Sequence, residues 1–89
     1  MLLKAPIDLT DCRTLKAFFR ECRTAIECRP GELVLDLSDV ECADSKLIAC
    51  LVLIERDADR CGIDCAVIAS TSVRRWADVL GLKTLLRVG

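Results

Sequence analysis

The 89-residue chain contains no histidine, and only 3% of its residues are aromatic. Without histidine, the Ser-His and Cys-His pairs of nucleophilic catalysis are excluded. The sequence also has no G-x-S-x-G turn, no phosphate-binding loop and no glycine-rich dinucleotide turn. Because no catalytic constellation remains, we expect a protein that is not an enzyme.

An excess of charge of one sign is also missing. The chain has 13 basic and 14 acidic residues, which gives a net charge of −1. Nucleic-acid binding requires a basic surface and benefits from aromatic stacking platforms, so we expect no nucleic-acid partner. Five cations gather in and after the first predicted helix, where acidic residues are interleaved with them: Arg13, Lys16, Arg20, Arg23 and Arg29. We interpret this pattern as a solvated helix face.

Long hydrophobic runs are absent, although 53% of the residues are hydrophobic. The run from Leu47 to Ile54 is much shorter than the roughly 18 residues needed to cross a bilayer. The start of the chain, Met1 to Lys4, has neither the basic nor the apolar part of a secretion signal. We therefore expect one soluble cytoplasmic domain over residues 1–89, with no transmembrane segment.

Cysteine, by contrast, is abundant, with seven residues in this short chain. They form no C-x-x-C pair, their number is odd, and no histidine could complete a zinc site. Cys50 and Cys65 lie inside apolar runs, where a thiol behaves as a small hydrophobic group. We expect reduced cysteines, no metal and no cofactor.

Short apolar segments alternate with longer amphipathic ones along the whole chain. The predicted elements are a strand over 2–7, a helix over 11–28, a strand over 32–37, a helix from Ser45 that Gly62 ends, a strand over 64–69, and a helix over 73–80 followed by Gly81. Alternation with short connections predicts parallel strands and the α/β class. In the last helix, we expect Trp76 to anchor packing rather than to bind a ligand.

The segment around Asp44 and Ser45 is the most informative part of the sequence, because a helix begins there after an acidic loop. Free N–H groups and the helix dipole favour a capping side chain at this position, and they also tolerate a phosphate. Both interpretations stay open. The loop also contains acidic residues, which we interpret as solvated carboxylates rather than cation ligands: Asp36, Asp39, Glu41 and Asp44.

The order and spacing of several motifs resemble the STAS domain family. These motifs are Asp36-Leu37-Ser38, then Asp44-Ser45-Lys46-Leu47-Ile48, then the strand over 63–69, and finally Gly81-Leu82. The resemblance extends from about Ile7 to Leu86. It implies a small α/β domain with a mixed, mostly parallel four-stranded sheet, about three helices and a reduced N-terminal strand.

The resemblance also implies a function, that of an anti-sigma factor antagonist switched by serine phosphorylation. The phosphoacceptor would be Ser45, and the partner a kinase of the GHKL type that binds the nucleotide itself and sequesters a sigma factor. The implied partner-binding residues surround Ser45: Asp39, Glu41, Asp44, Lys46 and Leu47. An open sheet edge would also favour a homodimer.

The family includes a second functional type, the constitutive STAS subunit or scaffold of a lipid-transporting ABC system. In that case the same helix would contact an ABC ATPase, and Ser45 would never be modified. Lys46 and Leu47 stand where the family usually has a small Ser-Gly pair. The apolar Leu47 favours this alternative, because it suits a permanent contact.

Overall fold

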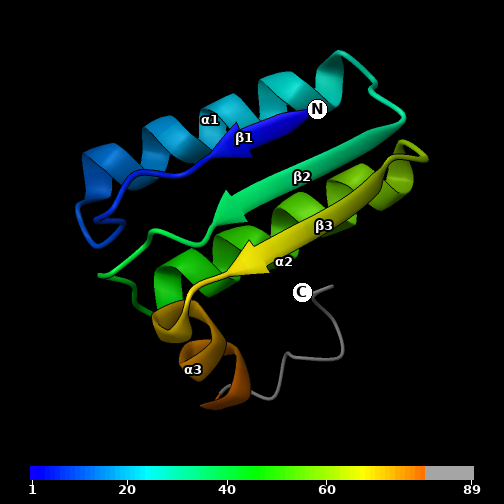
Figure 1. Cartoon of the computed structure of the whole chain (residues 1–89). Coiled ribbons are helices and arrows are strands. Elements are labelled where there is room, and N and C mark those ends of the chain that lie inside the picture. Colours follow the sequence, from blue (N-terminus) through cyan, green and yellow to red (C-terminus); the bar gives the residue numbers. More distant parts are fainter. Residues whose placement is uncertain (80–89) are drawn as a thin grey trace.

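Strands and helices alternate strictly in the computed structural model, which describes residues 1–79 (Figure 1). The elements are β1 (Leu2–Lys4), α1 (Cys12–Glu27), β2 (Glu32–Leu37), α2 (Ser45–Arg60), β3 (Asp64–Ala69) and α3 (Thr71–Val79). This arrangement confirms the predicted α/β class. The predicted Gly81 helix end and the Gly81-Leu82 motif lie outside the described residues.

The three strands form one sheet in the order β1-β2-β3, and both pairs are parallel. Residues 1–79 therefore form three strands rather than the predicted four, and a purely parallel sheet rather than a mixed one. Each described strand is joined to the next by a helix that crosses over the sheet, and such a crossover connection produces a parallel pair. β1 covers only Leu2–Lys4 and is shorter than the strand predicted over 2–7, although the Ala5 N–H still donates to the Asp36 carbonyl at 2.8 Å.

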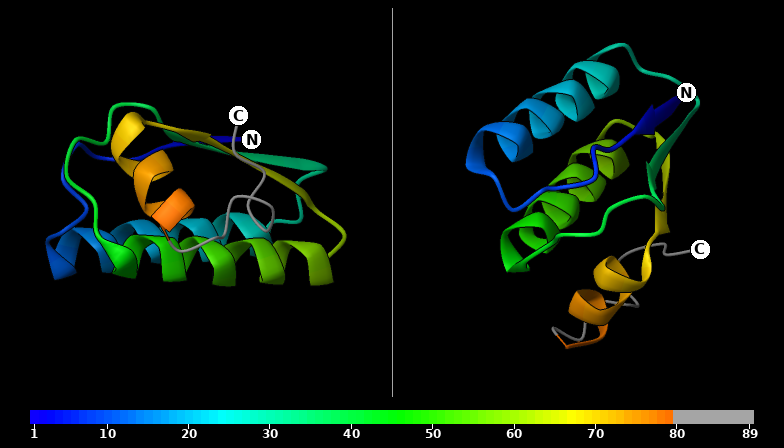
Figure 2. Two further views of the ribbon diagram at one scale, coloured as in Figure 1. Left: turned by 90° about the horizontal axis from the view of Figure 1, so that it is seen from below. Right: turned by 60° about the vertical axis from the view of Figure 1, so that its left-hand side comes forward.

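Both crossover helices, α1 and α2, lie on the same face of the sheet (Figure 2). When each right-handed crossover connection leads to the next strand in the same direction, all of the crossover helices lie on one face of the sheet. The side chains of β2 alternate accordingly: Leu33, Leu35 and Leu37 are fully buried beneath the helices, whereas Val34 and Asp36 face the other side. No helix within residues 1–79 covers that second face, which exposes Leu2 and Ile68.

Local signals set the ends of the helices. The carboxylate of Asp11 accepts a hydrogen bond from the N–H of Arg13 and caps α1. After α2, Gly62 adopts a φ of 71°, which favours glycine, and the Ile63 N–H reaches back to the Ala58 carbonyl at 2.8 Å. The prediction that Gly62 ends this helix is confirmed. None of the three described helices has the length and hydropathy that a membrane span requires.

Candidate functional site

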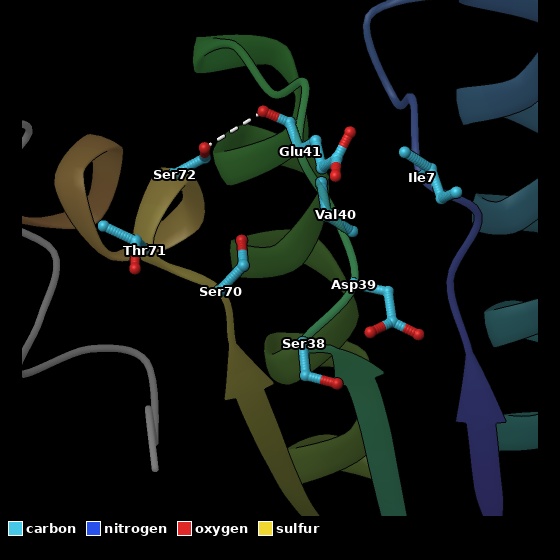
Figure 3. Close-up of a pocket in the computed structure, with 8 residues that line it drawn as sticks. All are labelled: Ile7, Ser38, Asp39, Val40, Glu41, Ser70, Thr71 and Ser72. Carbon is cyan, nitrogen blue, oxygen red and sulfur yellow. Dashed lines mark hydrogen bonds between the residues drawn. The ribbon is translucent and has the colours of Figure 1, made fainter.

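The candidate site lies at the carboxyl ends of the strands, where the loop over 38–44 connects β2 to α2 (Figure 3). Open α/β sheets usually bind ligands outside this edge, in a crevice where the strand order reverses. Here β1, β2 and β3 follow one another without reversal. The candidate site is therefore the surface of the loop and the first turn of α2, rather than a crevice between diverging strands.

The N-terminal segment after β1 holds one side of this loop. The N–H groups of Glu41 and Cys42 donate to the carbonyl oxygen of Ile7 at 2.9 and 3.3 Å, and the Leu9 N–H donates to the Cys42 carbonyl at 3.0 Å. A single parallel bridge pairs Asp8 with Cys42. The loop is therefore fixed to the rest of the domain beyond the end of β2.

Helix α3 holds the other side of the loop. The hydroxyl of Ser72 donates to the Glu41 carbonyl at 3.0 Å (Figure 3), and the indole Nε1 of Trp76 donates to the Ala43 carbonyl at 2.9 Å. Trp76 is half-buried and packs against the core, as predicted. Both bonds fix backbone atoms within four residues of Ser45, so the start of α2 is presented in one orientation.

Asp44, and not Ser45, caps α2. The carboxylate of Asp44 accepts a hydrogen bond from the Lys46 N–H at 2.9 Å, and its backbone is extended, as a cap requires. Ser45 is the first helical residue, and both Ser45 and Lys46 are exposed. The hydroxyl of Ser45 is thus not needed as the cap, and it faces solvent beside a carboxylate.

Leu47 is in a different position from its two neighbours. It is fully buried in the core, on the same helix face as Leu51 and Ile54. Its side chain cannot contact a partner while the domain keeps this fold. This corrects the expectation that Leu47 is a contact residue, and it removes the reason that Leu47 gave for preferring a permanent interface.

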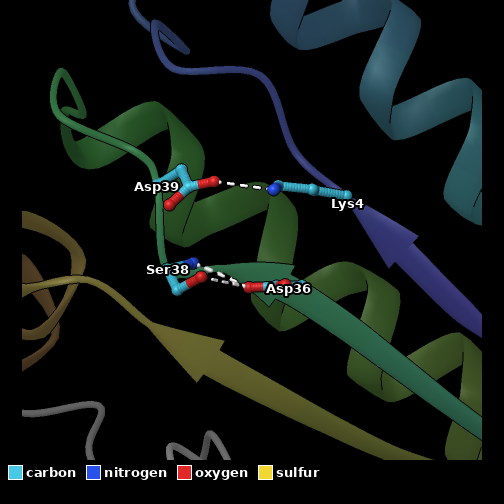
Figure 4. Close-up of polar contacts among 4 residues, drawn as sticks. All are labelled: Lys4, Asp36, Ser38 and Asp39. Atoms are coloured by element: carbon cyan, nitrogen blue, oxygen red, sulfur yellow. Dashed lines mark hydrogen bonds and ion pairs between the residues drawn. The ribbon is translucent and has the colours of Figure 1, made fainter.

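The acidic residues of the loop are engaged in separate local contacts (Figure 4). The Lys4 ammonium lies 2.8 Å from the Asp39 carboxylate, which raises the pKa of Lys4 through the hydrogen bond and then the charge. Both side chains are more than half exposed, so this pair adds little stability. Glu41 is exposed. Among residues 1–79, no group of three potential ligands could hold a metal ion.

Asp36 closes a tight turn at the end of β2 (Figure 4). One of its carboxylate oxygens accepts hydrogen bonds from the hydroxyl of Ser38 at 2.6 Å and from the Ser38 N–H at 3.0 Å. These bonds hold the pKa of Asp36 below its usual range, with the hydroxyl as the largest cause. The Asp-Leu-Ser motif therefore has a structural role in this chain.

A shallow polar cleft of about 490 Å³ lies between the loop and the start of α3 (Figure 3). Its lining residues are Ile7, Ser38, Asp39, Val40, Glu41, Ser70, Thr71 and Ser72. The Ser70 hydroxyl accepts a hydrogen bond from the Val73 N–H and caps α3. Sequence analysis did not identify the hydroxyl groups of Ser70, Thr71 and Ser72 as part of the site, because a Ser-Thr-Ser run after a strand is typical of a turn.

None of the seven cysteines, which all lie within residues 1–79, forms a disulfide. Burial raises the pKa of Cys22 to about 12, with a smaller effect from Cys65. Burial, followed by the negative charge of Asp44, also raises the pKa of Cys50. These shifts disfavour the reactive thiolate at both positions.

No family model matches this chain, and no curated protein is similar enough to count as a match.

Proposed function

We propose that this protein is a STAS-type binding module that acts as an anti-sigma factor antagonist and is switched by phosphorylation of Ser45. The observation that carries the proposal is the exposure of Ser45 at the first position of α2, directly after its cap, Asp44. The alternating order of strands and helices and the fixed loop before Ser45 also support it.

The switch has a simple electrostatic basis. A phosphate on Ser45 would add a charge of about −1.5 to −2 beside a helix N-terminus. Asp44 already occupies that terminus with its own carboxylate, so the phosphate would meet like-charge repulsion instead of a vacant cap. Lys46 would offset part of the new charge. A partner surface docked over this turn would therefore be released or redirected.

The proposed partner is a kinase of the GHKL type that also sequesters a sigma factor. It would bind the nucleotide, so this domain would need no cofactor. The residues proposed to contact it lie in the loop and in the first turn of α2: Asp39, Glu41, Asp44 and Lys46. The constitutive subunit of a lipid-transporting ABC system is the alternative outcome of the following test.

The test combines capture from the native host, under phosphatase inhibition, with mass spectrometry of the Ser45 peptide and of the co-purified proteins. We expect a phosphate on Ser45 and a GHKL-type kinase, and we expect Ser45→Asp to release that kinase while Ser45→Ala keeps it. Gly31→Asp is the control, because Gly31 is exposed before β2, a Cβ added there meets no neighbouring atom, and the residue does not line the cleft. Unmodified Ser45 with a stably bound transporter ATPase would instead identify the constitutive subunit.

A further inference from the structure

We infer that the groove between α1 and α2 binds an acidic amphipathic helix of a partner protein. The two helices lie side by side on the sheet (Figure 2), and a groove of about 700 Å³ opens between them. We call it the basic groove, after its four cations: Lys16, Arg20, Arg23 and Lys46. This inference rests on the proposed function only where it concerns Ser45.

The charge of the basic groove is strongly one-sided. Its four cations face one carboxylate, Glu27, although the chain as a whole carries a net charge of −1. Lys16, Arg20 and Arg23 are spaced at i, i+4 and i+7, which places them on one face of α1. Within residues 1–79, none of the four cations forms an ion pair. An acidic partner would supply the missing charge.

The groove also has an apolar floor. Phe19 and Cys50 line it and are half-buried, and the Arg23 guanidinium lies 5.9 Å from the centre of the Phe19 ring. Leu53 is exposed and follows Lys46 and Cys50 at i+7 and i+3 on the same face of α2. An apolar floor with charged rims fits an amphipathic helix, which places anchors at i, i+3, i+4 and i+7.

Two other classes of partner fit the groove less well. A nucleic acid would gain a stacking surface only from Phe19, which Arg23 already overlies. A lipid surface is flat and favours a protruding basic helix with an exposed apolar face, whereas here the apolar side chains lie between two helices. The concave shape and the lining together favour a helix.

The basic groove reaches the proposed switch, because Lys46 lines the groove and directly follows Ser45. A phosphate on Ser45 would place negative charge at the end of the groove. It would compete for Lys46 and repel an acidic helix. The groove thereby provides a partner surface on which modification of Ser45 would act.

Binding of a labelled probe peptide to the purified full chain, measured by fluorescence anisotropy, tests the inference. The probe is an acidic amphipathic helix of about four turns, with leucines at i, i+3, i+4 and i+7 between glutamates. We expect binding that weakens with salt, and Arg23→Glu to weaken it roughly tenfold. Arg56→Glu is the matched control, because Arg56 is exposed on α2 but does not line the groove, and we expect a change of less than about twofold.

Three results would overturn the inference: equal binding of a scrambled peptide, an equal effect of Arg56→Glu, or binding to anionic vesicles but not to the peptide. Circular dichroism of each variant checks the fold. The failure of each proposal is distinguishable. If the peptide binds and Ser45→Asp does not change its affinity, the basic groove is supported and the switch is not. If the peptide does not bind but capture of the kinase depends on Ser45, only the switch is supported.

Discussion

The indole Nε1 of Trp76 donates a hydrogen bond to the carbonyl oxygen of Ala43 at 2.9 Å, although 33 residues separate the two in the sequence. Through this bond, α3 fixes the backbone directly before the cap and the proposed phosphoacceptor of α2. The only tryptophan of the chain thus connects the packing of α3 to the presentation of Ser45.

Replacing Trp76 with phenylalanine tests this connection. Trp76→Phe keeps an aromatic ring but leaves the part-buried Ala43 carbonyl without its donor, so we expect a loss of about 1–2 kcal/mol in the free energy of unfolding. Urea unfolding measures the loss, and amide exchange reports loosening over residues 41–45. Ser72→Ala, which removes a more exposed bond to the same loop, should cost less. An equal cost would contradict the special role of Trp76.

The two aspartate caps offer a matched pair of substitutions. Asp11→Ala and Asp44→Ala each remove a carboxylate that accepts a hydrogen bond from the second residue of a 16-residue helix. Each should cost about 1 kcal/mol in chemical denaturation. Only Asp44→Ala should also weaken capture of the partner, because Asp11 caps the other helix. If both variants bound the partner equally well, Asp44 would be a cap alone.

Because of the turn at the end of β2, we expect the free energy of unfolding to depend on pH in the acid range. Because the folded pKa of Asp36 lies below its unfolded value, its contribution is present above about pH 4 and is lost as the pH falls through the folded pKa. We expect Ser38→Ala, which removes the larger cause of the shift, to flatten this part of the pH profile of unfolding free energy. An unchanged profile would show that the Ser38 hydroxyl does not stabilise the carboxylate.

Thiol reactivity should separate the seven cysteines by burial. Cys12, Cys28, Cys42 and Cys61 are exposed, and we expect them to react rapidly with a disulfide reagent in the native protein. Cys22 and Cys65 are buried, and they should react only on unfolding, with Cys50 in between. Mass spectrometry of timed samples identifies each site. Fast modification of Cys22 in native protein would contradict its burial.

The face of the sheet that no helix of residues 1–79 covers favours a homodimer. Leu2 and Ile68 are exposed on or beside this face, and β1 and β3 lie at its two edges within the described part of the chain. Light scattering at high concentration should give twice the mass of the 9.8 kDa chain, and Ile68→Lys should shift it toward the monomer. A monomer at high concentration would exclude the homodimer.

Residues that act locally made the elements predictable. The bounds of β2 and β3 match the prediction. Helix α2 begins after Asp44, whose side chain caps it, and ends before Gly62, whose backbone has a positive φ. The burial of Leu47 could have been predicted as well, since its spacing to Leu51 and Ile54 marks the core face of the helix.

Other features depend on elements that are distant in sequence. The cations of α1 looked like a solvated face, because only the packing of α1 beside α2 brings Lys46 and Cys50 next to them. Likewise, nothing near Ala43 in the sequence indicates that Trp76 bonds to it. The fourth strand, expected from the resemblance, has no counterpart in residues 1–79, where each strand is followed by a helix.

The strand register also bears on how the chain folds. Leu3 pairs with Leu35 and Leu35 with Val67, so each pairing closes a loop of the same length, 32 residues. The entropy lost in closing a loop depends on its length, so the two pairings face similar chain-entropy barriers. Each described strand pairs with the one that precedes or follows it in the chain, so the pairings can form in sequence order from the N-terminus. During synthesis β1 and β2 leave the ribosome before β3, so their pairing is the first that the length of the emerged chain allows.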